Sequence, residues 1–301
     1  MRENSRKVFK NGFIKEKLAS IDSNEFTLMK ETMLKILTEL IVVFDKHNIK
    51  YCLGGGSALG AQRHQGYIPW DDDIDINIQR ADFEKLRLVF ESELGEKYIL
   101  TTPEDTEGHG LLMSQVKKKD TIYRSFNELS KPDEISGIAI DLFVIENTFD
   151  SKLLRYTHGM VSLALGYLTT CRKTSIEFPL MKEYLDESSD AYKAFNKKAI
   201  IGKFFFFIPL DTLVKITNRV YSICRDDSTE FVTVPTGRRH FFGELYDRKV
   251  LTELKRVPFE NLIVNVPVNI DIYLTRLYGD KYMVIPPEVE WEQHDIMQLK
   301  L

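Results

Sequence analysis

The stretch Gly54–Ile78, GGGSALGAQRHQGYIPWDDDIDINI, constrains the fold of this chain more than any other. It opens with three glycines and a serine, and it closes with four aspartates in five positions. Neighbouring carboxylates repel one another unless a cation or a basic partner compensates their charge. The glycines at the other end let backbone N–H groups approach an anion closely. The stretch therefore favours a site that holds a metal ion together with a phosphate group.

The acidic end of this stretch predicts a strand. Residues 73–78 alternate polar and apolar side chains, which is the period of a half-buried strand. Asp73 and Asp75 then point to one side, with Cα atoms roughly 6.5–7 Å apart. Asp71 points to the same side if the strand begins early enough to include it. We expect Asp71, Asp73 and Asp75 to bind Mg²⁺, with Mn²⁺ as the substitute, because hard cations prefer carboxylate oxygens.

The glycine end predicts a strand, a turn and a helix. Residues 50–53 form the expected strand, and residues 58–64 form the expected helix, with Ser57 as its N-cap. Backbone N–H groups at a helix N-terminus bind anions. Gly55, Gly56 and the Ser57 hydroxyl are therefore candidate phosphate ligands.

Arg63 and His64 lie between the glycines and the aspartates. The Arg63 guanidinium suits two-pronged contact with a phosphate. Its alternative role is a salt bridge to Asp71 or Asp72 that only relieves the acidic cluster. His64 is expected to orient Asp71 or to contact a phosphate.

A second acidic candidate lies in the apolar run Gly137–Val144. Its only charged residue, Asp141, is costly to bury unless it is paired or binds a metal. We expect Asp141 to be the third carboxylate and to accept a proton from the acceptor, so Asp73, Asp75 and Asp141 are the candidate catalytic residues. The alternative is a strand-end aspartate held by backbone N–H groups or by an arginine.

The string GGSALGAQRHQGYIPWDDDIDI resembles the signature of the LicD family, which includes bacterial phosphocholine transferases and, more distantly, fukutin-related transferases. A second resemblance lies towards the C-terminus, in Val266-Pro267, Tyr273-Leu274, Tyr278-Gly279-Asp280, Tyr282-Met283, Pro286-Pro287 and His294. The resemblance implies a nucleotidyltransferase fold, an α+β architecture whose mixed sheet is flanked by helices. It also places the family's third acidic residue at Asp141. The proline pair is expected to return His294 to the site, although a surface histidine is the alternative.

The resemblance further implies a donor, CDP-choline, and an acceptor, a sugar of teichoic acid, lipopolysaccharide or capsule. The reaction expected is Mg²⁺-dependent transfer of a phospho-alcohol group to a sugar hydroxyl. Two alternatives stay open. One is a nucleotidyltransferase that moves a nucleoside monophosphate to a small acceptor, and the other is a non-catalytic acidic module that binds Ca²⁺. An EF-hand loop, with ligands over twelve residues and a final Glu, is absent.

The whole chain, residues 1–301, is expected to form one domain with a mainly helical insert at about 150–226. Helices are predicted over residues 151–170 and 180–201. Phe204–Phe207 is expected to face the core or another helix, and the alternative is a patch that contacts the inner membrane leaflet. The basic turn Lys117–Asp120 is expected to be a solvated hairpin tip.

Composition narrows the partners and the compartment. With a net charge of −4, the chain has no strong positive electrostatic field that would attract a nucleic acid. The three cysteines lack metal-site spacing and suit a reduced, cytoplasmic setting. The N-terminus shows no secretory signal, and no apolar run reaches the length of a transmembrane helix.

Overall fold

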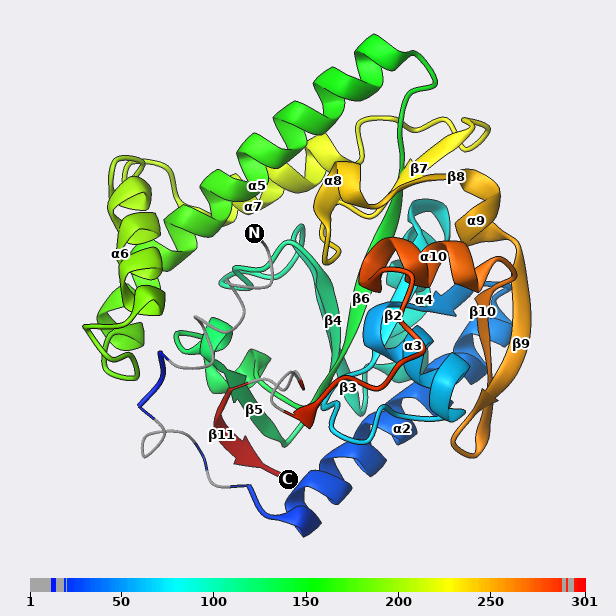
Figure 1. The fold of residues 1–301 in the computed structure, drawn as a ribbon, viewed down its shortest axis with the longest axis horizontal. Coiled ribbons are helices and arrows are strands. Elements are labelled where there is room, and N and C mark those ends of the chain that lie inside the picture. The colour runs from blue at the N-terminus through cyan, green and yellow to red at the C-terminus, as the bar shows by residue number, and fades with distance from the viewer. Residues whose placement is uncertain (1–11, 15–18, 20, 289–290, 292–294) are drawn as a thin grey trace.

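A seven-stranded mixed sheet forms the centre of the computed structural model, which describes residues 12–14, 19, 21–288, 291 and 295–301 (Figure 1). Five strands lie in the order β1-β2-β6-β4-β3, and β7 pairs with both β6 and β8. The strand pair β2–β6 is parallel, and the other pairs are antiparallel. The strands are β1 Tyr51–Leu53, β2 Asp75–Gln79, β3 Tyr98–Thr101, β4 Ser114–Lys118, β6 Ala139–Asn147, β7 Phe231–Thr233 and β8 Leu245–Asp247. The mixed sheet with its flanking helices confirms the predicted α+β class.

Helix α2, Ser23–Lys46, shows how the sequence builds the layer beside the sheet. The Asp22 carboxylate accepts hydrogen bonds from the backbone N–H groups of Asn24 and Glu25, and the Glu25 side chain accepts one from the Asp22 N–H. This reciprocal arrangement is a capping box, which satisfies otherwise unpaired N–H groups. Apolar residues then recur every three or four positions and are buried: Met29, Met33, Ile36, Leu37, Leu40, Val43 and Phe44. The apolar spacing of residues 25–46 predicts an amphipathic helix, and the structure confirms it.

The remaining elements complete the fold around the sheet. Two further helices that pack near β2 are α3, Gly55–His64, and α4, Arg80–Leu94. The smaller two-stranded sheets pair β9 with β10 and β5 with β11. These strands and the short helices are β5 Ile122–Ser125, η2 Phe126–Glu128, η3 Asp133–Ile135, α8 His240–Gly243, α9 Arg248–Thr252, β9 Leu254–Phe259, β10 Leu262–Pro267, α10 Ile270–Tyr278 and β11 Ile296–Lys300.

Three consecutive helices occupy residues 152–221 and lie together along one side of the molecule (Figure 1). They are α5 Lys152–Met181, α6 Asp190–Lys203 and α7 Leu210–Tyr221, and α5 packs against both others. The predicted break between residues 170 and 180 was wrong. Helix α5 continues to Met181, with Pro179 in its last turn, and the Lys173–Glu177 ion pair spans one turn of the predicted gap. Within the described part of the chain, no helix combines the length and apolar character needed to cross a bilayer.

The strand that carries the candidate aspartates is shorter and more deeply buried than predicted. Strand β2 begins at Asp75, so Asp71 and Asp73 precede it. The prediction that they point to one side of a strand together with Asp75 was therefore wrong. Its middle residues Ile76, Asn77 and Ile78 are all buried, with exposed fractions of 0, 2 and 0%. Both α3 and α4 pack against this strand, so its polar–apolar alternation does not mark a solvent face.

A buried ion cluster lies beside β4. The Glu128 carboxylate pairs with the ammonium groups of Lys117, at 3.0 Å, and Lys131, and all three side chains are almost wholly buried. The expectation of a solvated hairpin tip was therefore wrong. Lys117 is buried against a partner on η2 that local sequence does not reveal, and the strands on either side of the turn, β4 and β5, lie in different sheets. Burial by itself raises the pKa of Glu128, but Lys131 and Lys117 outweigh it and lower that pKa to about 2. Removing only one partner from such a buried ion cluster destabilises the fold, because the remaining charge is left buried without compensation.

Replacing Glu128 with glutamine should make the free energy of unfolding less dependent on pH in the acidic range. The folded-state pKa of Glu128 lies below its ordinary value, so ionisation stabilises the fold above about pH 4.5, and this stabilisation is lost as the pH falls towards 2. At pH 6, Glu128→Gln should lower the free energy of unfolding by roughly 3 kcal/mol, because two buried ammonium groups lose their carboxylate. Urea unfolding at pH 6, 4 and 3 should show this difference shrinking. A difference that stays constant with pH would contradict the assigned ion cluster.

Candidate active site

The parallel register of β2 and β6 places two candidate carboxylates side by side. Asp75 on β2 pairs with Asp141 on β6. Adjacent strands lie about 4.8 Å apart, and residues paired in register face the same side of the sheet. Both side chains are half-buried. The structure thus brings Asp141 beside Asp75, as the sequence led us to expect, although their catalytic role stays a prediction.

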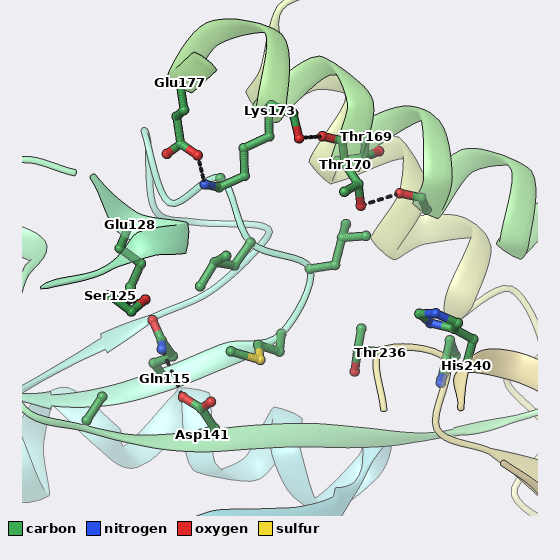
Figure 2. A pocket seen from close by; sticks show the side chains of 18 of the residues that line it. Gln115, Ser125, Glu128, Asp141, Thr169, Thr170, Lys173, Glu177, Thr236 and His240 are labelled. Atoms are coloured by element: carbon green, nitrogen blue, oxygen red, sulfur yellow. Dashed lines mark hydrogen bonds and ion pairs between the residues drawn. The ribbon is translucent and has the colours of Figure 1, made fainter. Parts of the chain in front are cut away.

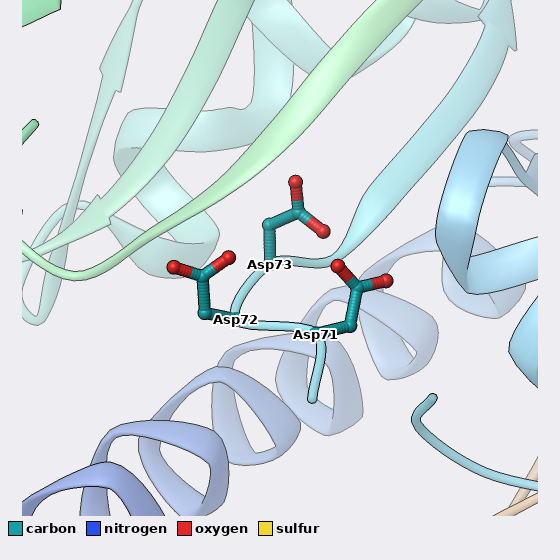
Figure 3. Close-up of side chains that lie close together, drawn as sticks. All are labelled: Asp71, Asp72 and Asp73. Atoms are coloured by element: carbon teal, nitrogen blue, oxygen red, sulfur yellow. The ribbon is translucent and has the colours of Figure 1, made fainter. Parts of the chain in front are cut away.

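The residues just before β2 form an acidic bend (Figure 3). One carboxylate oxygen from each of Asp71, Asp72 and Asp73 lies within 4.8 Å of the others. Asp72, which the sequence argument left out of the metal ligands, is the most buried of the three, at 4% exposure. The Asp71 N–H donates to the Ile68 carbonyl at 2.9 Å, a turn that replaces the expected strand. Asp72 therefore joins the candidate metal ligands that the sequence suggested.

The glycine turn makes room for two of these carboxylates. A Cβ atom on Gly55 would lie 2.2 Å from Asp75 Oδ2, and one on Gly56 would lie 2.5 Å from Asp71 Oδ2. Gly55 also has a positive φ of 40°, which disfavours other residues. Helix α3 therefore begins at Gly55, earlier than predicted, with its first turn against the acidic residues.

Hydrogen bonds fix this turn to the sheet and to α10. The Tyr273 hydroxyl accepts from the Gly55 N–H and from Asn77 Nδ2, both at 2.9 Å. Ser57 lies inside α3 rather than at its N-cap, and its hydroxyl accepts from the Asp75 N–H at 2.9 Å. Phosphate contact by Gly55, Gly56 and Ser57 stays a prediction.

Arg63 holds the C-terminal segment, and His64 pairs with Arg63. Arg63 Nη1 donates to the Tyr282 carbonyl at 3.0 Å and to the Val284 carbonyl at 3.4 Å. Arg63 Nε donates to His64 Nε2 at 2.9 Å, so that nitrogen is an acceptor. Burial and the Arg63 charge lower the pKa of His64, which agrees with a neutral imidazole. The phosphate contacts expected of both residues stay predictions, and His294 lies outside the described residues.

Tyr278 and Arg238 lie near the aspartates and were not among the candidate residues. The Arg238 guanidinium carbon lies 5.1 Å from the centre of the Tyr278 ring. Burial raises the pKa of Tyr278, Arg238 opposes this shift, and the charges of Asp75, Asp71 and Asp73 add to it. The Tyr278 phenol therefore interacts electrostatically with both Arg238 and the acidic residues. The only sequence signal was the basic run at residues 238–240, which is equally typical of a surface turn.

A cavity of about 660 Å³ opens between the sheet and α5 (Figure 2). Asp73 and Asp141 line it, and Figure 2 shows Asp141 on the sheet side of the cavity, with Thr236 and His240 at one end. Its polar wall on α5 includes Thr169, Thr170, Lys173 and Glu177. Ligand pockets commonly have volumes of about 300–1,000 Å³, so this cavity has the size of a small-molecule site.

Gln115 fixes the orientation of the Asp141 carboxylate. Lys131 Nζ donates to Gln115 Oε1 at 3.2 Å, and Gln115 Nε2 donates to Asp141 Oδ1 at 2.8 Å. An ammonium group can only donate, so Lys131 sets which end of the amide faces Asp141. Asp141 therefore accepts a hydrogen bond from an amide group whose orientation is fixed.

Replacing Gln115 with leucine should weaken Mn²⁺ binding by about 10–100-fold, the usual effect of losing a group that orients a metal ligand. Turnover should fall in parallel. The Mn²⁺ dissociation constant and the free energy of unfolding should be measured on the same samples. Lower stability with an unchanged dissociation constant would show that Gln115 only supports the fold.

The acidic groups have the chemistry of a hard-cation site. Their donors are carboxylate oxygens, which suit Mg²⁺ or Mn²⁺ better than Zn²⁺. The three oxygens of Asp71, Asp72 and Asp73 are close enough to share one ion. The residues present therefore fit the expected metal.

Comparison with known proteins agrees with this site. The family model described as LicD/FKTN/FKRP, nucleotidyltransferase domain, matches residues 48–159, a range that contains the glycine turn, the acidic bend and Asp141. The chain is 25% identical over 274 residues to the lipopolysaccharide cholinephosphotransferase LicD of Haemophilus influenzae, covering 88% of this chain and 94% of that protein. It is also 44% identical over 43 residues to the human ribitol 5-phosphate transferase FKRP, covering 14% of this chain and 9% of that protein. Residues 48–159 thus match the LicD/FKTN/FKRP nucleotidyltransferase domain, and the similarity to the Haemophilus protein extends over most of the chain.

Proposed function

We propose that this protein transfers a phospho-alcohol group from a CDP-alcohol, with CDP-choline first, to a sugar hydroxyl of a cell-surface glycan. The phosphorus–oxygen bond to CMP breaks, and a new ester bond to the sugar oxygen forms. The hydroxyl proton leaves to a carboxylate, and CMP is released. The protein is thus a transferase of phosphorus-containing groups, as are its two named relatives.

The observation that carries the proposal is the meeting of carboxylates from separate chain segments at one cavity. Asp73 from the acidic bend and Asp141 from β6 line the same cavity, and Asp75 is in register with Asp141. Phosphoryl transfer needs compensation of phosphate charge and positioning of the reacting oxygens, rather than a covalent protein intermediate.

Each group has a role in this proposal. Asp73, Asp75 and Asp141 would hold Mg²⁺ or Mn²⁺, with Asp71 or Asp72 completing the set. When bound, the ion supplies neutralising charge to the donor pyrophosphate. Asp141, oriented by Gln115, accepts the proton of the sugar hydroxyl. Arg238 would attract the leaving CMP phosphate.

Aromatic and acidic residues near the cavity support choline as the alcohol of the proposed donor. Tyr123 lines the cavity, whereas Trp70 and Trp291 stack on each other with their ring centres 4.1 Å apart. Burial and the charges of Asp72 and Asp73 raise the pKa of Tyr123, so its phenol lies near the acidic bend. A quaternary ammonium group binds well to an aromatic face in a negative environment.

The proposed compartment is the cytoplasm. All three cysteines, Cys52, Cys171 and Cys224, are buried free thiols. Unpaired thiols are typical of proteins in a reducing compartment.

The proposal is tested by incubating the purified protein with Mg²⁺, a glycan acceptor and a panel of CDP-alcohols carrying choline, ethanolamine, glycerol or ribitol. CMP release that depends on the acceptor and stops with EDTA is the expected result, with CDP-choline fastest. A parallel arm with nucleoside triphosphates tests the nucleotidyltransferase alternative. Pyrophosphate release in that arm, with no CMP from any CDP-alcohol, would contradict the proposal.

A further inference from the structure

The turn between α6 and α7 exposes a cluster of phenylalanines. Phe204, Phe206 and Phe207 are 72, 73 and 66% exposed, so the expectation that this run faces the core was wrong. Ile200 lies one helical turn before Phe204 and is 49% exposed, which extends the apolar surface onto α6. We call Ile200 and Phe204–Phe207 the Phe turn. Contiguous exposed apolar side chains of this kind mark an interaction site.

The Phe turn is held in a defined shape. Arg172 of α5 donates from Nη2 to the Phe206 carbonyl at 3.3 Å and from Nε to the Ile208 carbonyl at 3.2 Å. The Ile208 N–H donates to the Phe205 carbonyl at 3.0 Å. The rings are therefore presented by a fixed backbone, and their exposure is a feature of the fold.

The surroundings of the Phe turn are basic. Residues 190–222 contain six Lys or Arg residues and two acidic residues, Asp190 and Asp211, in a chain whose net charge is −4, and Asp190 pairs with Lys193 at 3.3 Å. Asp211 is half-buried, and its carboxylate accepts from the Gly108 N–H. Five of the basic residues are exposed: Lys193, Lys197, Lys203, Lys215 and Arg219. A second copy of this basic surface would be repelled, whereas an anionic surface would be attracted.

We propose that the Phe turn and this basic rim dock the protein on an anionic lipid bilayer. The rings would enter the boundary between headgroups and acyl chains, and the lysines would contact the lipid phosphates. The same helix α6 contributes Phe195 and Lys198 to the wall of the cavity. Docking would therefore bring the cavity close to the lipid surface. Figure 1 shows α6 at the end of the molecule opposite β9 and β10.

The test is co-sedimentation of the full chain with vesicles of phosphatidylglycerol and phosphatidylcholine, compared with vesicles of phosphatidylcholine alone. The protein should bind the anionic vesicles more tightly, and salt should weaken this binding. The double variant Phe206→Glu/Phe207→Glu should bind at least about tenfold more weakly, because it loses apolar contact and adds negative charge.

The matched control is Val42→Glu/Leu88→Glu, which changes two apolar residues of α2 and α4 that are 63 and 86% exposed. It should bind vesicles like the parent protein, and circular dichroism should show both variants folded. Equal loss in both variants, or no binding by the parent protein, would overturn the proposal. A dimer in size-exclusion chromatography that only the Phe variant disrupts, without vesicle binding, would instead assign the patch to self-association. CMP release with a water-soluble acceptor should be unchanged in the Phe variant, so this test fails or succeeds separately from the proposed activity.

Discussion

Replacing Asp141 with asparagine should lower kcat/KM for CMP release by on the order of 10³-fold. Asparagine has nearly the same shape and can still accept the hydrogen bond from Gln115 Nε2, so the loss isolates the charge. That charge is expected both to bind the cation and to accept the acceptor proton. The measurement is initial rate with saturating Mg²⁺, and Mn²⁺ should restore little activity.

The control for this variant is Asp82→Asn. Asp82 is a buried carboxylate of α4 that pairs with Lys85 and does not line the cavity. Its replacement should affect stability more than turnover. If Asp141→Asn retained a kcat/KM within a few-fold of the parent, then Asp141 would be only a structural strand residue, the alternative that the sequence left open.

Replacing Gly55 with alanine should cost both stability and activity. The new Cβ would lie 2.2 Å from Asp75 Oδ2, so the carboxylate must move away from its present position. The left-handed backbone at this residue adds a penalty of about 1–2 kcal/mol for any residue with a Cβ. We expect a loss of 10²-fold or more in turnover, since small displacements at a reacting centre have effects of this size.

The matched control is Gly108→Ala. Gly108 also has a positive φ, of 70°, but a Cβ there would meet nothing within 4 Å. It should show the backbone penalty in urea unfolding while keeping its activity. The contact with Asp75 can be isolated in a double-mutant cycle, because Asp75→Ala should remove part of the stability loss of Gly55→Ala. Additive losses in that cycle, or equal activity in the two glycine variants, would show that the Gly55 position does not serve the carboxylate.

Local sequence rules predicted the elements whose signals are local. The apolar spacing of residues 25–46 predicts α2. The glycine at position 279 predicts the end of a short helix over residues 270–278, which is α10, Ile270–Tyr278. The apolar run around Asp141 predicted a buried strand, and the register places that residue beside Asp75. For these parts of the fold, neighbours in sequence supply the decisive interactions.

Interactions between distant residues were beyond such rules. Tyr273 meets the Gly55 N–H although 218 positions separate them. Gln115, Lys131 and Glu128 form one polar chain that reaches Asp141. Only the Glu128–Lys131 pair is local, and no sequence signal connects Lys131 to Gln115 or Gln115 to Asp141. The residues that orient the site were therefore missed, while residues that carry its charge were found.

The acidic bend and the Phe turn show two other limits. Polar–apolar alternation suggested a strand from residue 73, but the chain turns through Asp71–Asp73 and gathers three carboxylates instead. Four consecutive phenylalanines suggested a core position, but a turn stabilised by Arg172 directs three of them outward. In both places a backbone turn, rather than the hydrophobic pattern, decides where the side chains point.

The most direct test of the central claim is an Mn²⁺ titration followed by electron paramagnetic resonance, with Mg²⁺ as competitor. We predict that the parent protein binds Mn²⁺, that Mg²⁺ displaces it, and that Asp73→Asn and Asp141→Asn each weaken binding at least about tenfold because each removes a charged ligand. Asp82→Asn should bind like the parent protein. Unchanged Mn²⁺ affinity in both the Asp73 and the Asp141 variants would contradict a shared cation site between the acidic bend and β6.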